Sequence, residues 1–247
     1  MKTSEERSVL VDKKANGKKV ANEKLLDKLE KLAPSYSRAP LLGMLLALSF
    51  AYCVSKIIIE EREKFDLSIP LDDMIPFCAP FILFYVLAYV QWGIGYMIIA
   101  KQDKDVCYRM AGGNIIAKML CFLIFIIVPT QMFSRPEVTG TSVFDYITRL
   151  IYWIDTPVDL FPSIHCLESY TVMRFTLKRK EFPLYYKILN VVLSLLVFLS
   201  VVLTKQHIVV DIPAGILIFE IGYLISNLTG FYKVFDKFDK KSKVKEI

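Results

Sequence analysis

Long apolar runs alternate with short polar segments along most of this chain. A helix needs about 20 apolar residues to cross a bilayer. Runs near that length occupy residues 41–59, 74–100, 114–132, 187–203 and 208–228, and a shorter run at 164–177 contains Glu168 and Arg174. The pattern predicts an all-α, polytopic membrane protein with about six transmembrane helices in one bundle.

Composition agrees with this prediction, because 54% of the 247 residues are hydrophobic and the mean hydropathy is +0.43. The net charge of +6 is unevenly distributed. Lysine and arginine crowd residues 1–39, 174–187 and the chain end from Lys233, whereas the loops at 60–73 and 135–159 are balanced or acidic. By the positive-inside rule, both termini and the loops at 101–109 and 174–187 are expected in the cytoplasm. Cytoplasmic loops account for the basic charge, so no nucleic-acid partner is expected.

The same pattern divides the chain into three parts. Residues 1–39 form a basic cytoplasmic N-terminal tail, 40–229 the membrane domain, and 230–247 a basic cytoplasmic C-terminal tail. The first forty residues lack an apolar segment of the kind that opens a cleaved signal peptide. Residues 20–32 could form a helix on the inner leaflet or remain a solvated tail. The five cysteines are scattered, with no spacing typical of a disulfide framework or a metal site.

The loop at 134–162 is the longest segment between predicted spans. Its middle, residues 144–154, is amphipathic and rich in aromatic residues. Tyrosine and tryptophan favour the membrane–water boundary, so the segment is expected to form an interfacial helix. It could bound a site open to the outer leaflet or serve only as an anchor.

The only two histidines, His165 and His207, each lie in a polar motif at a predicted membrane edge. One motif is Phe-Pro-Ser-Ile-His, ending at His165; the other is Lys-Gln-His, ending at His207, with Asp211 four residues later. Under the predicted topology, both motifs and Arg135 reach the same side of the membrane. Charged residues within a bilayer are costly and usually functional.

Phosphoryl transfer is the chemistry that uses this set. Asp211 would lie on one helical face with His207, hold its Nδ1–H and stabilise the cation formed when Nε2 attacks phosphorus. His165 would protonate the leaving alkoxide. Arg135 offers a planar fork for phosphate oxygens, and Ser163 opens a helix whose free N–H groups attract anions.

Other readings of these residues remain. Arg135 alone could reach toward lipid head groups, and either histidine alone could be a structural hydrogen-bonding residue. The His207–Asp211 spacing also suits two metal ligands, but the sequence offers no evident third ligand. No metal or cofactor is expected.

Together these motifs resemble the type 2 phosphatidic acid phosphatase (PAP2) superfamily of membrane phosphatases and phosphotransferases. That family carries Lys-x6-Arg-Pro, then Pro-Ser-Gly-His, then Ser-Arg-x5-His-x3-Asp, on a six-helix core. This chain has Arg135-Pro136, then Pro-Ser-Ile-His at 162–165, then Ser200 with His207 and Asp211. The resemblance covers about residues 75–229. It implies that His207 forms a phosphohistidine, Asp211 orients it, His165 is the acid, and Arg135 and Ser163 hold phosphate.

Three positions depart from the family pattern. Val128 replaces its lysine, Ile164 its glycine and Val201 its second arginine. Lys205 or Arg149 could restore a charge, and Lys205 is predicted to bind phosphate. The sparser pattern is similar to the branch that includes sphingomyelin synthase and inositol phosphorylceramide synthase.

The sequence therefore predicts a metal-independent phosphatase of a lipid phosphate, in the cell membrane, with its site on the extracytoplasmic side. The alternative is a lipid phosphotransferase or head-group transferase using the same intermediate. A non-enzymatic protein, either a transporter of anionic lipids or a catalytically inactive relative, would not need two histidines and an aspartate. Substrate and membrane lipids are the expected partners; the particular lipid and the oligomeric state are left open.

Overall fold

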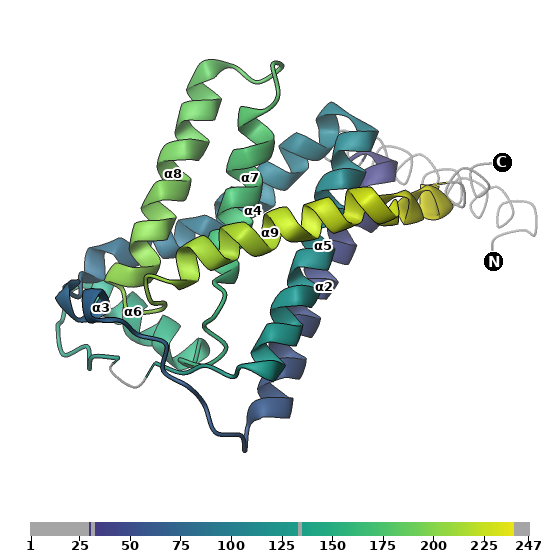
Figure 1. Cartoon of the computed structure of the whole chain (residues 1–247). Coiled ribbons are helices and arrows are strands. Elements are labelled where there is room, and N and C mark those ends of the chain that lie inside the picture. Colours follow the sequence, from purple (N-terminus) through teal and green to yellow (C-terminus); the bar gives the residue numbers. More distant parts are fainter. Residues whose placement is uncertain (1–29, 31–32, 133–134, 240–247) are drawn as a thin grey trace, which may run out of the picture.

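The computed structural model describes residues 30, 33–132 and 135–239. Within these residues, five helices are long and apolar enough to cross a membrane (Figure 1). They are α2 (Ser35–Ile59), the segment Ala79–Gln102 made of η1 (Ala79–Phe81) and α4 (Ile82–Gln102), α5 (Lys104–Ile127), α8 (Leu184–Leu203) and α9 (Asp211–Thr229). Shorter helices join them: α3 (Pro70–Met74), α6 (Val143–Ile154), α7 (Ile164–Leu177) and η2 (Phe231–Phe235). The prediction of an all-α polytopic membrane protein is confirmed.

The short apolar segment at 164–177 is α7, which lies inside the bundle (Figure 1). At 1.5 Å per residue, its 14 residues extend about 21 Å, less than a hydrocarbon core of about 30 Å. Most of its residues are buried, and α4, α5, α8 and α9 pack around it. Neighbouring helices rather than lipid therefore surround its polar side chains.

The junction between α4 and α5 is shorter than the predicted loop at 101–109. Only Asp103 separates the two helices, and its side chain caps α5 by accepting a hydrogen bond from the Val106 N–H at 3.0 Å. The charged residues that follow belong to α5, where Arg109 pairs with Asp105 at 2.6 Å and bonds the Tyr232 hydroxyl at 2.8 Å. Because protein groups meet these charges, the helix begins ten residues earlier than the apolar run at 114–132.

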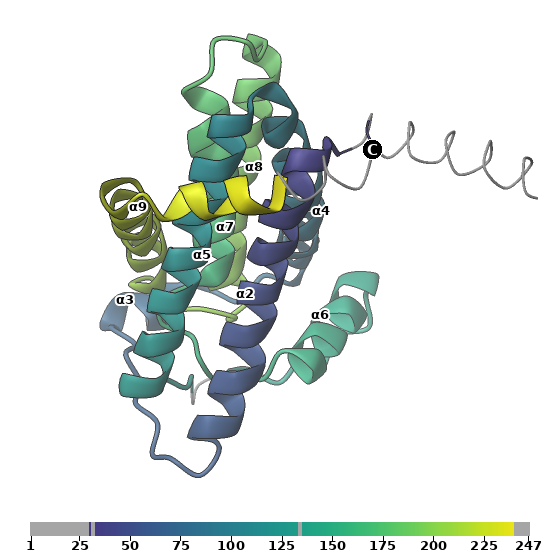
Figure 2. The ribbon, with the colours of Figure 1, turned by 90° about the vertical axis from the view of Figure 1, so that its right-hand side faces the viewer.

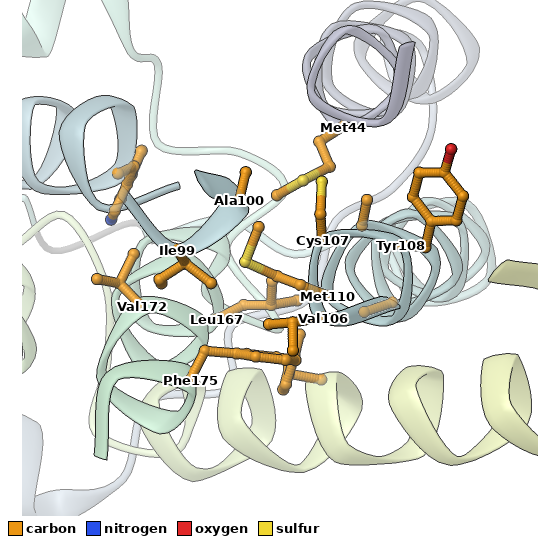
Figure 3. Close-up of a cluster of buried hydrophobic side chains, with 14 of the residues drawn as sticks. Met44, Ile99, Ala100, Val106, Cys107, Tyr108, Met110, Leu167, Val172 and Phe175 are labelled. Carbon is orange, nitrogen blue, oxygen red and sulfur yellow. The ribbon is translucent and has the colours of Figure 1, made fainter. Parts of the chain in front are cut away.

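An apolar core runs along the inside of the bundle, and Figure 3 shows the part of it near the end of α4 and the start of α5. Leu167, Val172 and Phe175 of α7 lie in this core with Val106 and Met110 of α5. The core also includes Ile164, the first residue of α7, so this packing fixes α7 relative to its neighbours along its whole length.

A buried ion pair also ties α7 to α5. The Lys118 ammonium lies 2.5 Å from a Glu168 carboxylate oxygen, and both side chains are 2% exposed. Lys118 also donates to the Met44 carbonyl of α2 at 2.9 Å, and Asn114 donates to Glu168 at 2.9 Å. Tyr96 of α4 donates to the same carboxylate. The network joins four helices and satisfies a charge pair inside an apolar bundle.

Helix α9 crosses its neighbours at two glycines. A Cβ at Gly215 would lie 2.4 Å from the Ser163 carbonyl oxygen, and one at Gly222 would lie 2.6 Å from the Ala117 nitrogen. Only glycine allows these backbone approaches. Through them α9 is held against the start of α7 and the middle of α5.

The amphipathic segment at 144–154 forms α6, which lies at one edge of the bundle (Figure 2). Ser142 and Asp145 form a capping box at its start. Phe144 and Ile151 pack inward, whereas Trp153 on the outer face is 79% exposed. The segment is therefore a helix with an exposed apolar face, and its place at a membrane interface stays a prediction.

The predicted tails differ in how much the structure describes. The possible helix at 20–32 lies outside the described residues, apart from Glu30. The predicted C-terminal tail begins at residue 230, but η2 follows α9 directly and its Tyr232 and Phe235 are buried. The packed bundle thus continues beyond the predicted boundary at residue 229.

Candidate active site

Both histidines line one cavity of about 300 Å³. Its walls come from α2, α4, the end of α6 with the following segment, the start of α7, and the turn between α8 and α9. Most lining side chains are apolar or aromatic, including Leu48, Tyr52 and Trp92. A small polar group of side chains thus faces an otherwise apolar space, as is typical of binding pockets.

His207 is held by two acceptors at the same nitrogen. Its Nδ1 lies 2.9 Å from Asp211 Oδ2 and 3.0 Å from the Leu160 carbonyl oxygen. Because both partners can only accept, the proton belongs on Nδ1. Nε2 then carries the lone pair, on a side chain that lines the cavity.

The contact between His207 and Asp211 arises differently from the prediction. The sequence suggested that both lie on one helical face, but α9 begins at Asp211 and His207 lies in the preceding turn. Asp211 Oδ2 also accepts from the Ile208 N–H at 3.2 Å, so this carboxylate closes the turn around His207. Asp211 is fully buried, and within the described residues its Oδ1 has no hydrogen-bond partner.

His165 lies in a box of aromatic side chains. Its ring stacks on Tyr85 with centroids 4.1 Å apart and lies 5.1 Å from the Trp92 ring. Its Nε2 is 3.2 Å from the Tyr89 hydroxyl. The centroids of His165 and His207 are 6.0 Å apart. Both imidazoles can therefore contact one small group in the cavity.

Ser163 is the N-cap of α7, as the sequence predicted for the start of this helix. Its Oγ accepts from the Cys166 N–H at 3.3 Å, and its own N–H donates to the Asp211 carbonyl at 3.3 Å. The side chain is fully buried and is not among the residues that line the cavity. Its observed contacts place His165 relative to α9; they do not present the hydroxyl to the cavity.

Arg135 is brought next to the site but binds protein acceptors. Its guanidinium donates to the Lys205 carbonyl at 3.3 Å, the Asp155 carbonyl at 2.9 Å and Gln206 Oε1 at 2.7 Å. It also lies 4.3 Å from the centre of the Tyr152 ring. Arg135 does not line the cavity.

Lys205 does not line the cavity that contains the two histidines. Its ammonium donates to the carbonyl of Asp72, within α3, at 2.8 Å and to that of Ile75, directly after α3, at 2.6 Å. Its backbone has a φ of 51°, which turns the chain out of α8 and toward His207. Asp72 supports the same turn by accepting from the Val209 N–H at 2.7 Å. Lys205 is therefore a tether between α3 and the turn.

Arg149, the other candidate for a missing cation, holds its own loop. Its guanidinium donates to the carbonyls of Val138 at 2.8 Å and Gly140 at 2.7 Å. Neither substitute lines the cavity that contains the histidines.

Two carboxylates that the sequence analysis did not single out line the cavity. Asp155 accepts from the Tyr85 hydroxyl at 2.8 Å and lies 3.9 Å from the Lys56 ammonium. Asp159 accepts from the Ser55 hydroxyl at 2.7 Å, and its other oxygen has no partner within the described residues. Burial raises the pKa of Asp155 to about 6, and it also raises the pKa of Asp159. The sequence does not reveal this group because Asp155 and Asp159 lie far along the chain from Ser55, Lys56 and Tyr85.

The chain matches no family model, no curated protein and no protein of solved structure. Among the described residues, no group of three or more histidine, cysteine or acidic side chains is placed to hold a metal ion. The geometry of the cavity is therefore the basis for assigning a function.

Proposed function

We propose that this protein is a membrane lipid phosphate phosphatase that works through a phosphohistidine on His207. The observation that carries the proposal is the double acceptor at His207 Nδ1, from Asp211 and the Leu160 carbonyl. It leaves Nε2 as the nucleophilic atom in a cavity shared with His165. The motif resemblance to type 2 phosphatidic acid phosphatases points to the same roles.

The first step forms a bond between His207 Nε2 and phosphorus and breaks the bond between phosphorus and the lipid oxygen. His165 takes the proton of the incoming phosphate monoester and gives it to that leaving oxygen. His207 keeps the proton on Nδ1, and the Asp211 carboxylate stabilises the positive charge on the phosphorylated ring. Products are the lipid alcohol and the phosphohistidine.

The second step returns the enzyme to its starting state. Water attacks phosphorus, the phosphorus–Nε2 bond breaks, and His165 accepts a proton from the attacking water. Inorganic phosphate leaves with that proton, His207 regains its lone pair, and His165 is again neutral. No step in this scheme uses a metal ion.

The arrangement of charge supports an extracytoplasmic site. The histidines lie where α7 and α9 begin, whereas Lys101, Lys104 and Arg179 lie at the opposite ends of the helices. Basic residues favour the cytoplasmic side. A lipid phosphate in the outer leaflet would then present its phosphate to His207 with its chains toward the apolar part of the bundle.

Phosphate release by the purified full-length protein in detergent tests the proposal. A panel of lipid phosphates would be assayed with EDTA present, for wild type, His207→Ala, Asp211→Asn and the matched control Asp73→Asn, which changes an exposed aspartate of α3. The expected result is release by wild type and Asp73→Asn, with loss of about 10²–10⁴-fold or more in the two site variants. Wild-type turnover by His207→Ala would exclude the mechanism.

A second candidate function is transfer of the phosphoryl or head group to a lipid alcohol. The observation that favours it is the polar lining of the cavity, where Asp155 and Asp159 face the space and the predicted cations Arg135 and Lys205 do not. Carboxylates disfavour a doubly charged phosphate monoester and suit a singly charged diester or a hydroxyl-bearing acceptor. Product analysis with and without an added lipid alcohol separates the two, because only a transferase makes a new phosphate ester.

A further inference from the structure

Gln206, directly before the proposed nucleophile, carries a buried hydrogen-bond donor without a partner. The side chain is 2% exposed and lines the cavity beside His207. Its Nε2 has no hydrogen-bond partner within the described residues. A buried amide nitrogen is rarely left unpaired in a native protein, so this atom indicates a ligand.

The orientation of this amide follows from Arg135. Gln206 Oε1 accepts from the Arg135 guanidinium at 2.7 Å. A guanidinium has only donors, so the oxygen of the amide must face Arg135 and the nitrogen must face the other way. Arg135 itself is fixed by the carbonyls of Lys205 and Asp155. Its positive charge polarises the amide and strengthens Nε2 as a donor.

We propose that Gln206 Nε2 donates a hydrogen bond to a non-bridging oxygen of the phosphoryl group while that group is transferred to and from His207. The inference rests on the proposed function and adds a residue to its site. Of the other polar groups in the cavity, Asp155 and Asp159 offer acceptors, which a phosphoryl oxygen does not need. A fixed neutral donor beside a reacting phosphoryl group acts as an oxyanion-hole residue does.

Arg135 is then a positioning residue for Gln206. This role explains why Arg135, which the sequence predicted to bind phosphate, lies at the site but donates to protein oxygens. The cation acts through the amide rather than by touching the phosphoryl group.

Vanadate, which mimics a phosphoryl group in transfer, is the probe for this donor. The experiment measures the vanadate dissociation constant by thermal shift of the full-length protein, and kcat on the best lipid of the panel. The variants are Gln206→Ala, Gln206→Met, which keeps the side-chain volume, and His207→Ala. The matched control is Gln91→Ala, a buried glutamine of α4 bonded to Ser194 and outside the cavity.

The expected result is a loss of about 10²–10³ in kcat for both Gln206 variants, as for removal of one oxyanion donor, with vanadate binding weakened in parallel. Gln91→Ala should lower the melting temperature and leave vanadate affinity unchanged. If folded Gln206→Met keeps wild-type kcat and vanadate affinity while His207→Ala loses both, Gln206 is only structural and the inference is wrong. If His207→Ala keeps both, the proposed function itself fails and the inference with it.

Discussion

At the scale of single residues, the site depends on which partner each charged group finds. Asp211 meets His207, and Arg135 meets Gln206, whereas Lys205 meets the end of α3. A buried polar group is stable only when it is hydrogen-bonded. Arg135 and Lys205 are bound to protein oxygens and therefore do not line the cavity. The neutral amide of Gln206 lines it beside His207 instead.

Asp155 gives a prediction about pH. Its pKa in the folded protein is raised by burial to about 6, above an unfolded value of about 3.9. The folded state therefore binds an extra proton between these values, and this contribution to stability is present below about pH 4 and lost as pH rises through about 6. Asp155→Asn should reduce the fall in melting temperature between pH 4.5 and 7.5. Thermal unfolding in detergent at both pH values measures this change in melting temperature for wild type and Asp155→Asn.

The matched control for this prediction is Asp73→Asn, because Asp73 is exposed. It should keep the pH dependence of wild type. If Asp155→Asn unfolds with the same pH dependence as wild type, the carboxyl does not titrate near pH 6 in the folded protein.

At the scale of helices, the distance between the two histidines is set by the contact of α7 with α9. His165 is in the first turn of α7, and Asp211, which holds His207, is the first residue of α9. Ser163 donates from its backbone to the Asp211 carbonyl, and Gly215 admits the Ser163 carbonyl into the face of α9. The first turns of α7 and α9 are thus in contact, and this contact sets the positions of the His165 and His207 imidazoles.

Gly215→Ala tests this contact. The added Cβ would lie 2.4 Å from the Ser163 oxygen, so α7 and α9 must separate. We expect a loss of about 1–3 kcal/mol in stability together with reduced turnover. Melting temperature and phosphate release measure the two effects.

Gly93→Ala in α4 is the control for the same substitution, because a Cβ there meets no atom within 4 Å. Alanine favours a helix over glycine, so this variant should keep activity and be unchanged or more stable by up to about 1 kcal/mol. If both glycine variants behave alike, close approach at Gly215 does not position the histidines.

At the scale of the whole molecule, the Lys118–Glu168 pair joins the helices that surround α7. Lys118→Met would leave the Glu168 carboxylate buried without its cation, at a cost of about 3–5 kcal/mol. The double variant Lys118→Met/Glu168→Leu should lose less stability than the sum of the single changes. A thermodynamic cycle of unfolding free energies measures this coupling. Additive losses would show that the pair does not act as a unit.

The position of the cavity predicts how substrate reaches the histidines. Cys53 of α2 is exposed and also lines the cavity. A bulky maleimide at Cys53 should therefore block turnover, and Cys53→Ala should be active and resistant to the reagent. Cys78, which is partly exposed and outside the cavity lining, is the control: Cys78→Ala should remain sensitive. Inhibition that persists in Cys53→Ala would mean that α2 does not border the path to the site.

The sequence by itself determined the apolar helices and the placement of His165, His207 and Asp211 at their ends. The reason is that a bilayer requires each spanning segment to be long and apolar on its own, and polar motifs at segment ends remain visible between the runs. The start of α5 was missed because Lys104 and Arg109 find protein partners that the apolar run does not show.

Only the tertiary structure decided which groups face the cavity. Arg135 meets Gln206 across 71 positions, and Lys205 meets Asp72 across 133. Asp155 joins Tyr85 across 70 positions. Hydrogen-bond partners so far apart depend on how the helices are packed, and no local pattern encodes them. For that reason the sequence did not show that Arg135 and Lys205 bind protein oxygens. The unpaired Nε2 of Gln206 is likewise visible only in the folded chain.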